Sequence, residues 1–238
     1  MRTTLILCLL ALGSGIGCGG DDTTTTADAP NVPAMITITG TASERSASGS
    51  NPKAGVMVAA YKNSDAATVV AMSTTDAAGM YTLTIPTGGA PIDGYVKATV
   101  TGLVDTYLYP PKPLIADFSG ASLNMITQGT LDLLSGTLCG SGQEATKGVI
   151  AVLIVDAAMT PIEGATATGT PAPAKICYNG SSGLPDRNAT VTQPDGVAYM
   201  LNVGPGEVTV NASKSGLTFV SHKVNARAGV FTTTPISP

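Results

Sequence analysis

The stretch STTDAAGMYTLTIP, residues 73–86, joins a turn to a strand that has one apolar face. Residues 76–79, Asp-Ala-Ala-Gly, suit a tight turn, because Asp hydrogen-bonds to nearby backbone and Gly adopts backbone angles that other residues resist. Tyr81, Leu83 and Ile85 then recur at a spacing of two, which places all three on the same face of a β-strand. One strand cannot bury that face alone, so the pattern predicts a second sheet packed against it.

A second stretch, TVTQPDGVAYMLNV at residues 190–203, repeats this phrase. Its Tyr-x-Leu-x-Val pattern starts at Tyr199, 118 residues after Tyr81 (199 − 81), and follows a comparable Asp-Gly turn. The offset predicts that Tyr199, like Tyr81, faces the core of a sandwich. Upstream, PKAG at residues 52–55 corresponds to PIEG at residues 161–164. These matches predict two copies of one module, each of about 80–95 residues.

The composition favours short strands joined by turns over long helices. The chain has 238 residues, of which 28 are Gly and 16 are Pro, and 43% of its residues are hydrophobic. Frequent turn residues between short apolar alternations are typical of β-sandwiches. The net charge is −4 and no basic cluster stands out, so nucleic acid is not an expected partner.

The same residues resemble a known family, the carboxypeptidase regulatory-like domain. The resemblance rests on P-x-x-G-V-x-V, then T-D-x-x-G-x-Y-x-L-x-I-P, then the strand GYVKAT. That family is similar to transthyretin and to the collagen-adhesin B-type repeats, so the resemblance implies β-sandwiches of about seven strands. The second copy departs from the pattern by one extra residue between Gly196 and Tyr199, and by a long insert at residues 168–189.

The predicted fold class is therefore all-β, with two tandem Greek-key β-sandwiches of the prealbumin-like type joined by a linker. Leucine and isoleucine recur near helical spacing in the linker, which predicts one short helix over residues 121–138 that packs on a module. A partner-binding helix is the alternative. The expected divisions are a signal peptide at 1–17, a disordered tether at 18–34, the first sandwich at 35–112, the linker at 113–146, and the second, divergent sandwich at 147–238.

The first residues, MRTTLILCLLALGSGIGC, resemble a bacterial lipoprotein signal peptide. Its apolar run is too short to span a bilayer, and Gly-Ile-Gly places small residues before Cys18, where a signal peptidase cuts. The resemblance implies that Cys18 carries lipid and anchors the chain to a membrane of the cell envelope, on a periplasmic or surface-exposed face of the outer membrane. Ordinary signal peptidase would cut at the same place without lipidation.

Cys139 and Cys177 are expected to form a disulfide. If lipid occupies Cys18, these two remain as an even pair in an oxidising compartment. Closing that loop would stabilise the fold by about 3–4 kcal/mol. The alternative is a pair of unrelated buried thiols.

The sequence offers no recognisable catalytic or cofactor site. His222 is the one histidine and alternates with apolar residues, so we expect it to pack in a strand. A zinc site, which needs several convergent ligands, is therefore not expected. The chain has no G-x-S-x-G elbow, no phosphate-binding loop and no calcium loop. We expect no catalytic residue, no metal and no cofactor.

Two functions compete on these observations. The first is a non-enzymatic, membrane-anchored lipoprotein whose sandwiches bind a protein or glycan ligand or act as a spacer at the cell envelope. The second is a carbohydrate-binding accessory lipoprotein of a polysaccharide degradation or uptake system. Glycans bind flat aromatic surfaces, and the candidates are Tyr107 and Tyr109, which share one face of a strand. Packing of these two rings in the core is the competing interpretation.

Overall fold

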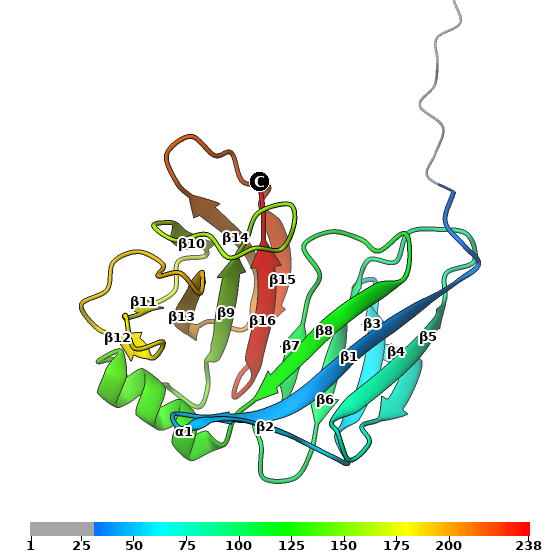
Figure 1. Ribbon diagram of the computed structural model, residues 1–238, viewed down its shortest axis with the longest axis horizontal. Helices are drawn as coiled ribbons and strands as arrows, with labels where there is room; N and C mark the ends of the chain where they lie inside the picture. The colour runs from blue at the N-terminus through cyan, green and yellow to red at the C-terminus, as the bar shows by residue number, and fades with distance from the viewer. Residues whose placement is uncertain (1–30) are drawn as a thin grey trace, which may run out of the picture. The chain divides into compact units, whose positions relative to one another are not determined.

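Residues 31–238 are described by the structure, a computed structural model (Figure 1). These residues form one compact unit. Their elements are strands apart from one short helical segment, which confirms the all-β prediction. The predicted signal peptide, Cys18 and most of the tether lie outside the described residues.

The first sequence copy and part of the linker form eight strands in two facing layers. In one layer, β1 pairs with β2 and β5 along one edge and with β8 along the opposite edge. The other layer has the order β4-β3-β6-β7. Leu83, Val96 and Leu123 belong to the core between them, with Leu83 1% and Leu123 0% exposed. The bounds are β1 (Met35–Ser46), β2 (Gly49–Pro52), β3 (Met57–Lys62), β4 (Asp65–Thr74), β5 (Met80–Pro86), β6 (Gly94–Thr99), β7 (Thr106–Leu108) and β8 (Phe118–Met125).

The second copy also forms two layers. The first is β12-β11-β13-β9-β16, and the second is the three-stranded sheet β10-β14-β15. Between them lies a core that includes Ile150, Met200 and Val210, all of which are 0% exposed. The bounds are β9 (Gly148–Ile154), β10 (Thr166–Thr170), β11 (Lys175–Asn179), β12 (Pro185–Asp186), β13 (Val197–Val203), β14 (Gly206–Ser213), β15 (His222–Ala226) and β16 (Phe231–Ile236).

A single nine-stranded sheet runs through both copies, in the order β12-β11-β13-β9-β16-β7-β6-β3-β4. Strand β16 makes the junction, because it pairs in parallel with β9 on one edge and with β7 on the other. The sequence patterns predicted two sandwiches but not this shared sheet, since the pairing joins segments 125 residues apart (231 − 106). The domain boundaries at residues 112 and 147 remain predictions.

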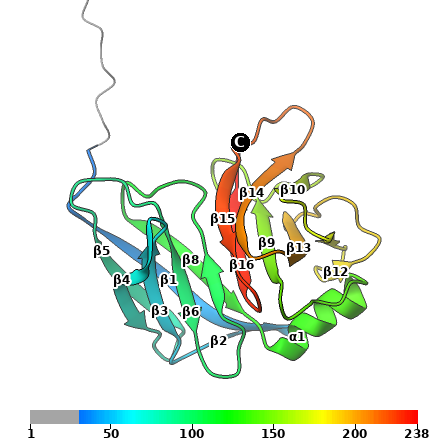
Figure 2. The ribbon, with the colours of Figure 1, turned by 180° about the vertical axis from the view of Figure 1, so that it is seen from behind.

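The two smaller sheets cover opposite faces of the nine-stranded sheet. Tyr107, Thr232 and Ile150 are neighbours in the strand register, so they lie on one face, and in the second copy the three-stranded sheet packs on that face. In the first copy the four-stranded sheet covers the opposite face of the nine-stranded sheet. Val96 of β6 lies on that face and packs with Leu83 of β5. Figure 1 shows β1 and β8 in front of β6 and β7, and Figure 2 shows β14 and β15 over β9 and β16 from behind.

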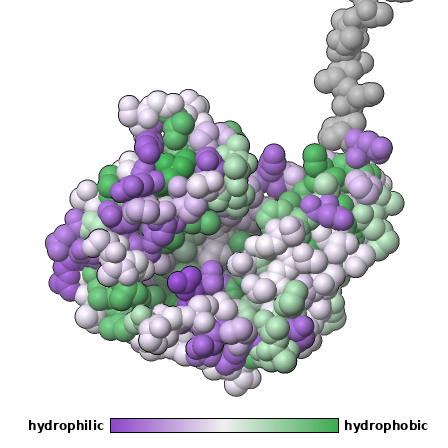
Figure 3. Space-filling model, in the orientation of Figure 1, coloured by the Kyte–Doolittle hydropathy of each residue, from purple (hydrophilic) through white to green (hydrophobic). Residues whose placement is uncertain are grey.

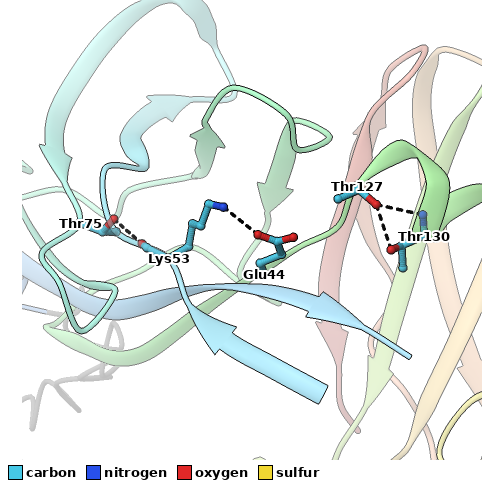
Figure 4. Close-up of polar contacts among 5 residues, drawn as sticks. All are labelled: Glu44, Lys53, Thr75, Thr127 and Thr130. Carbon is cyan, nitrogen blue, oxygen red and sulfur yellow. Dashed lines mark hydrogen bonds and ion pairs between the residues drawn. The ribbon is translucent and has the colours of Figure 1, made fainter. Parts of the chain in front are cut away.

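The helix prediction over residues 121–138 was right only in its second half. Residues 121–125 belong to β8, because Ala121, Leu123 and Met125 alternate at a spacing of two and are all buried. The helix α1 (Gln128–Asp132) follows and continues as one π-helical segment, η1 (Leu133–Leu138). Thr127 caps α1 by accepting a hydrogen bond from the backbone N–H of Thr130 at 3.0 Å (Figure 4). No helix within residues 31–238 is long and apolar enough to cross a bilayer.

The predicted disulfide between Cys139 and Cys177 is present, with the two Cα atoms 5.7 Å apart. It joins the residue after η1 to the middle of β11. Beneath the helix, Leu131 and Cys139 pack with Val149 and Phe231 in a third, smaller cluster. The helix therefore packs on the face of β9 and β16 that the three-stranded sheet leaves open.

The predicted orientation of Tyr199 was wrong. Ala198 and Met200 occupy the sandwich core, both 0% exposed, and Tyr199 between them lies on the other face of β13. The extra residue between the turn Gly and Tyr199 shifts the alternation by one position, which moves every side chain to the opposite face. A register shift around Asn202, which has a φ of 54°, returns Val203 to the core.

Candidate ligand-binding groove

A groove of about 510 Å³ lies where the four-stranded sheet ends and the nine-stranded sheet continues. Its floor is the face of β9, β13 and β16 that the three-stranded sheet does not cover. Its wall is the free edge of β8. Figure 3 shows this hollow near the centre of the surface. The cavity continues past β8 to core side chains of the first sandwich, including Ile38 and Ile85.

The side chains of β9 alternate between the two faces of the sheet, and this alternation determines which of them form the groove floor. Ile150 and Val152 point into the sandwich core and are 0% exposed, whereas Ala151 and Leu153 point to the opposite face and remain partly exposed. The helix covers one end of this face. The other end stays open, so apolar side chains line a cavity that a ligand can reach.

The wall is a strand with one unpaired edge. Among the described residues, β8 pairs with β1 alone, in parallel, from Phe118 to Met125. Gly120, Ser122 and Asn124 of this strand line the groove. The edge of β8 at the groove therefore carries backbone N–H and C=O groups that pair with no other strand of the described residues.

One corner of the groove is polar. Asn179 at the end of β11 is buried, with 3% of its surface exposed, and its Nδ2 donates to Asp195 Oδ2 at 2.6 Å. Asp195 also accepts from the backbone N–H of Val197 at 3.2 Å through Oδ1. Asn179 Oδ1 is buried and has no hydrogen-bond partner within residues 31–238. A buried carbonyl oxygen that lacks a donor is uncommon, and in a cavity wall it marks a place where a ligand N–H or O–H would be stabilised.

Tyr199 and Arg45 belong to the same corner. Burial raises the pKa of the Tyr199 hydroxyl, and the negative charge of Asp195 raises it further, while the nearby Asn179 amide and the Arg45 guanidinium lower it. The hydroxyl therefore stays protonated at neutral pH and can donate a hydrogen bond. Arg45 makes no ion pair with any described residue, so its charge is available to a ligand.

The disulfide supports this corner directly. Cys177 lies on β11 two residues before Asn179, and its partner Cys139 ends the helical segment. Arg187 adds a second connection, because its guanidinium donates to the backbone carbonyl of Thr137. The disulfide thus holds β11, which carries Asn179, against the helical segment, and Arg187 holds the end of its neighbour β12 there.

The predicted glycan residues belong to a buried tyrosine cluster, of which Tyr109 lines the groove and Tyr107 does not. Tyr107 and Tyr109 are 8% and 2% exposed, and the Tyr95 ring lies 5.5 Å and 5.0 Å from theirs. Arg227 Cζ lies 4.2 Å from the centre of the Tyr107 ring, and its Nη1 donates to the Tyr109 hydroxyl at 3.0 Å. Glycan contact through Tyr107 and Tyr109 remains a prediction, and it would require this cluster to open.

Apart from Tyr109, the groove residues were missed by sequence reasoning. Arg45, Asn179 and Tyr199 come from β1, β11 and β13, and only the tertiary structure brings them together. One signal was available, the extra residue before Tyr199, which reverses the face of that side chain. Within residues 31–238 no three His, Cys, Asp or Glu side chains are grouped so that they could hold a metal ion.

No family model matches the chain, and no curated protein matches it. Solved structures that align with it include the TIE protein of Bacillus anthracis, at 14% identity and a TM-score of 0.27 over 84% of this chain and 33% of that one. The chain thus spans about a third of that protein. Shaft pilin SpaA of Lactobacillus rhamnosus GG aligns at 11% identity and a TM-score of 0.27, over 86% of this chain and 98% of that one. The minor pilin GBS52 of Streptococcus agalactiae aligns at 12% identity and a TM-score of 0.28, over 85% of this chain and 94% of that one. At these scores the likenesses carry no functional argument.

Proposed function

We propose that this chain is a non-enzymatic, membrane-anchored protein of the cell envelope that binds a ligand in the groove beside β8. The observation that carries the proposal is the groove itself, which combines a largely apolar lining with a polar corner at Asn179. Its volume of about 510 Å³ falls within the range of ligand sites, about 300–1,000 Å³. Lipidation of Cys18 would hold the binding unit at a membrane.

A thermal-shift screen tests ligand binding. We would use the chain without its first 18 residues against peptides, amphipathic acids and oligosaccharides. A ligand at 100 times its Kd stabilises the folded state by about 2.7 kcal/mol, so its binding raises the melting temperature. Leu153→Arg places a large charged side chain on the groove floor and should abolish the shift.

The matched control is Val220→Arg, in the loop between β14 and β15, where the parent side chain is 65% exposed and is not part of the groove lining. This variant should bind as the parent does. Equal loss of binding in both variants, or no ligand in any class, would contradict the proposal. Turnover of ester, peptide or glycoside substrates by the same protein would contradict its non-enzymatic part.

The second candidate function is carbohydrate binding as part of a polysaccharide degradation or uptake system. Its aromatic contacts would come from four stacked or tilted tyrosine rings, Tyr61, Tyr95, Tyr107 and Tyr109, of which Tyr61 is partly exposed and the other three are buried. Glycan-array binding that is lost in a folded Tyr61→Ala variant, as well as in Tyr107→Ala and Tyr109→Ala, would favour this function. A blank array would count against it.

A further inference from the structure

We infer that the groove ligand is an extended peptide. It adds as a parallel strand to the free edge of β8 and places a carboxylate at its C-terminal end beside Arg45. This inference rests on the proposed function, because it assumes that the groove is a ligand site. It goes further by naming the class of ligand and its direction.

The second sandwich already shows such a strand addition. Strand β16 pairs in parallel with β9, as β8 pairs in parallel with β1, so β16 and β8 are equivalent strands in the two copies. The second edge of β16 is occupied by β7, also in parallel. Phe231 N donates to the Asp105 carbonyl at 3.0 Å, and Tyr109 N donates to the Thr233 carbonyl at 3.0 Å.

The corresponding edge of β8 has no strand partner among the described residues. An exposed strand edge is a template for another chain, because its backbone N–H and C=O groups are arranged to pair. Gly120, Ser122 and Asn124 line the groove, so this edge opens into the cavity and not onto a flat surface. A strand added here would extend the four-stranded sheet across the uncovered part of the nine-stranded sheet.

The groove floor would then receive every second side chain of the added strand. Ala151, Leu153 and Val197 are partly exposed apolar side chains on that floor. Side chains of a strand alternate between its faces, and a strand of six residues is about 20 Å long. The fitting peptide therefore has apolar residues at alternate positions.

The charge at the end of the groove sets the direction of the peptide. Met125 at the C-terminal end of β8 is the partner of Glu44, and Arg45 is the next residue of β1. A peptide parallel to β8 brings its own C-terminal end to this place. The Arg45 guanidinium has no acidic partner in the part of the chain that the structure describes, and it matches a carboxylate in charge and hydrogen-bonding geometry. Asn179 Oδ1 is the nearby acceptor for a peptide N–H.

A display selection tests the inference. The probe is a random heptapeptide library with free C-terminal carboxylates, selected against the chain without its first 18 residues. We expect enriched peptides to carry apolar residues at alternate positions. A synthetic copy with a C-terminal amide, and the variant Arg45→Ala with the free acid, should each bind at least tenfold more weakly. Lys223→Ala, on the three-stranded sheet, is the control and should bind normally.

Hydrogen exchange supplies a readout specific to strand addition. Backbone amides of Phe118–Met125 that point to the free edge of β8 should gain protection when the peptide binds, because the others already pair with β1. Amides of β15, an edge strand of the three-stranded sheet, should not change. Failure to enrich peptides, or binding without protection of β8, would overturn the inference. If amphipathic acids or oligosaccharides bind and Leu153→Arg blocks them, the inference fails but the proposed function stands. If nothing binds, both fail.

Discussion

Thr75 and Thr192 hold the equivalent turns of the two sandwiches by the same pair of hydrogen bonds. The Thr75 Oγ1 accepts from the backbone N–H that follows the PKAG turn at 2.9 Å and donates to the Lys53 carbonyl at 2.7 Å, as the dashed line in Figure 4 marks. Thr192 Oγ1 does the same at the PIEG turn, accepting at 2.9 Å and donating to the Ile162 carbonyl at 2.7 Å. The repetition therefore extends from the sequence pattern to individual side-chain contacts.

Replacing either threonine by alanine should destabilise the protein by about 1–3 kcal/mol, because a buried backbone N–H and a carbonyl each lose their partner. Thr75 is 5% and Thr192 is 0% exposed, so water would not readily replace the hydroxyl. Urea unfolding measures the change. Thr75→Ser and Thr192→Ser keep the hydroxyl and should lose clearly less stability; equal losses in Ser and Ala variants would show that the methyl group matters and not the hydrogen bonds.

Gly79 and Gly196 should tolerate alanine less well than other glycines of the same backbone conformation. Their φ values are 73° and 67°, and an added Cβ would lie 2.4 Å from the Ala42 carbonyl oxygen and 2.5 Å from that of Ile154. Both overlaps are with backbone of a neighbouring strand, which cannot move without disturbing the sheet.

Gly55 is the matched control, because it has a φ of 74° and no atom of the described part of the chain lies within 4 Å of an added Cβ. Gly55→Ala should lower the free energy of unfolding by about 1 kcal/mol, from backbone strain alone. Gly79→Ala and Gly196→Ala should each lower it by more. Chemical denaturation of the three variants decides this. Equal losses would mean that the close approach of the strands is not what requires glycine.

The fold could be predicted from the sequence wherever one local pattern determines it. Tyr81, Leu83 and Ile85 are buried as their spacing predicts, because they follow an intact turn. Tyr199 was predicted on the wrong face, since one inserted residue reverses a pattern of period two. The start of the linker helix was wrong for a related reason: five residues of β8 can satisfy both a strand and a helix spacing when apolar residues are dense.

The candidate site could not be predicted, because its parts come from distant segments. The nine-stranded sheet depends on the pairing of β7 with β16, and neither strand carries a signal for a partner in the other copy. Asn179 lies in the insert that departs from the first copy, so no comparison within the chain predicts its surroundings. Arg45 lies in the first copy and Asn179 and Tyr199 in the second, so only the pairing across the two copies brings the three together.

Removing the disulfide should lower both stability and groove binding. The double variant Cys139→Ala/Cys177→Ala is expected to lose about 2–5 kcal/mol of unfolding free energy, because the unfolded chain regains its freedom. Because the bond holds the strand that carries Asn179, ligand affinity should fall as well. A reducing agent should lower the melting temperature of the parent and leave that of the double variant unchanged. A parent insensitive to reduction would contradict the prediction.

Arg227 should stabilise the contact between the two sandwiches through the tyrosine cluster. Its guanidinium lies over the rings of Tyr95 and Tyr107, 4.8 Å and 4.2 Å from their centres. Arg227→Ala should therefore lower the free energy of unfolding by about 1–3 kcal/mol. Arg227→Lys should lower it less, because a lysine keeps the charge but not the planar stacking. Lys223→Ala removes an exposed ion pair to Glu207 and should change stability by less than about 1 kcal/mol. Similar effects of the two alanine variants would argue against a special role for Arg227.

His222 should make the protein less stable as the pH falls below about 6.5, its ordinary pKa. Its Nε2 lies 2.6 Å from Thr234 Oγ1, and its Nδ1 is buried with no hydrogen-bond partner among the described residues, so burial lowers the pKa of the ring in the folded state. The unfolded chain then binds the proton more readily, and the stability present above pH 6.5 is lost as the pH falls through the folded pKa. It is the one histidine of the chain, so His222→Gln should remove this part of the pH dependence. Urea unfolding of both proteins at pH 7.5 and pH 5.5 measures it; an equal loss in parent and variant would assign the effect to carboxyl groups instead.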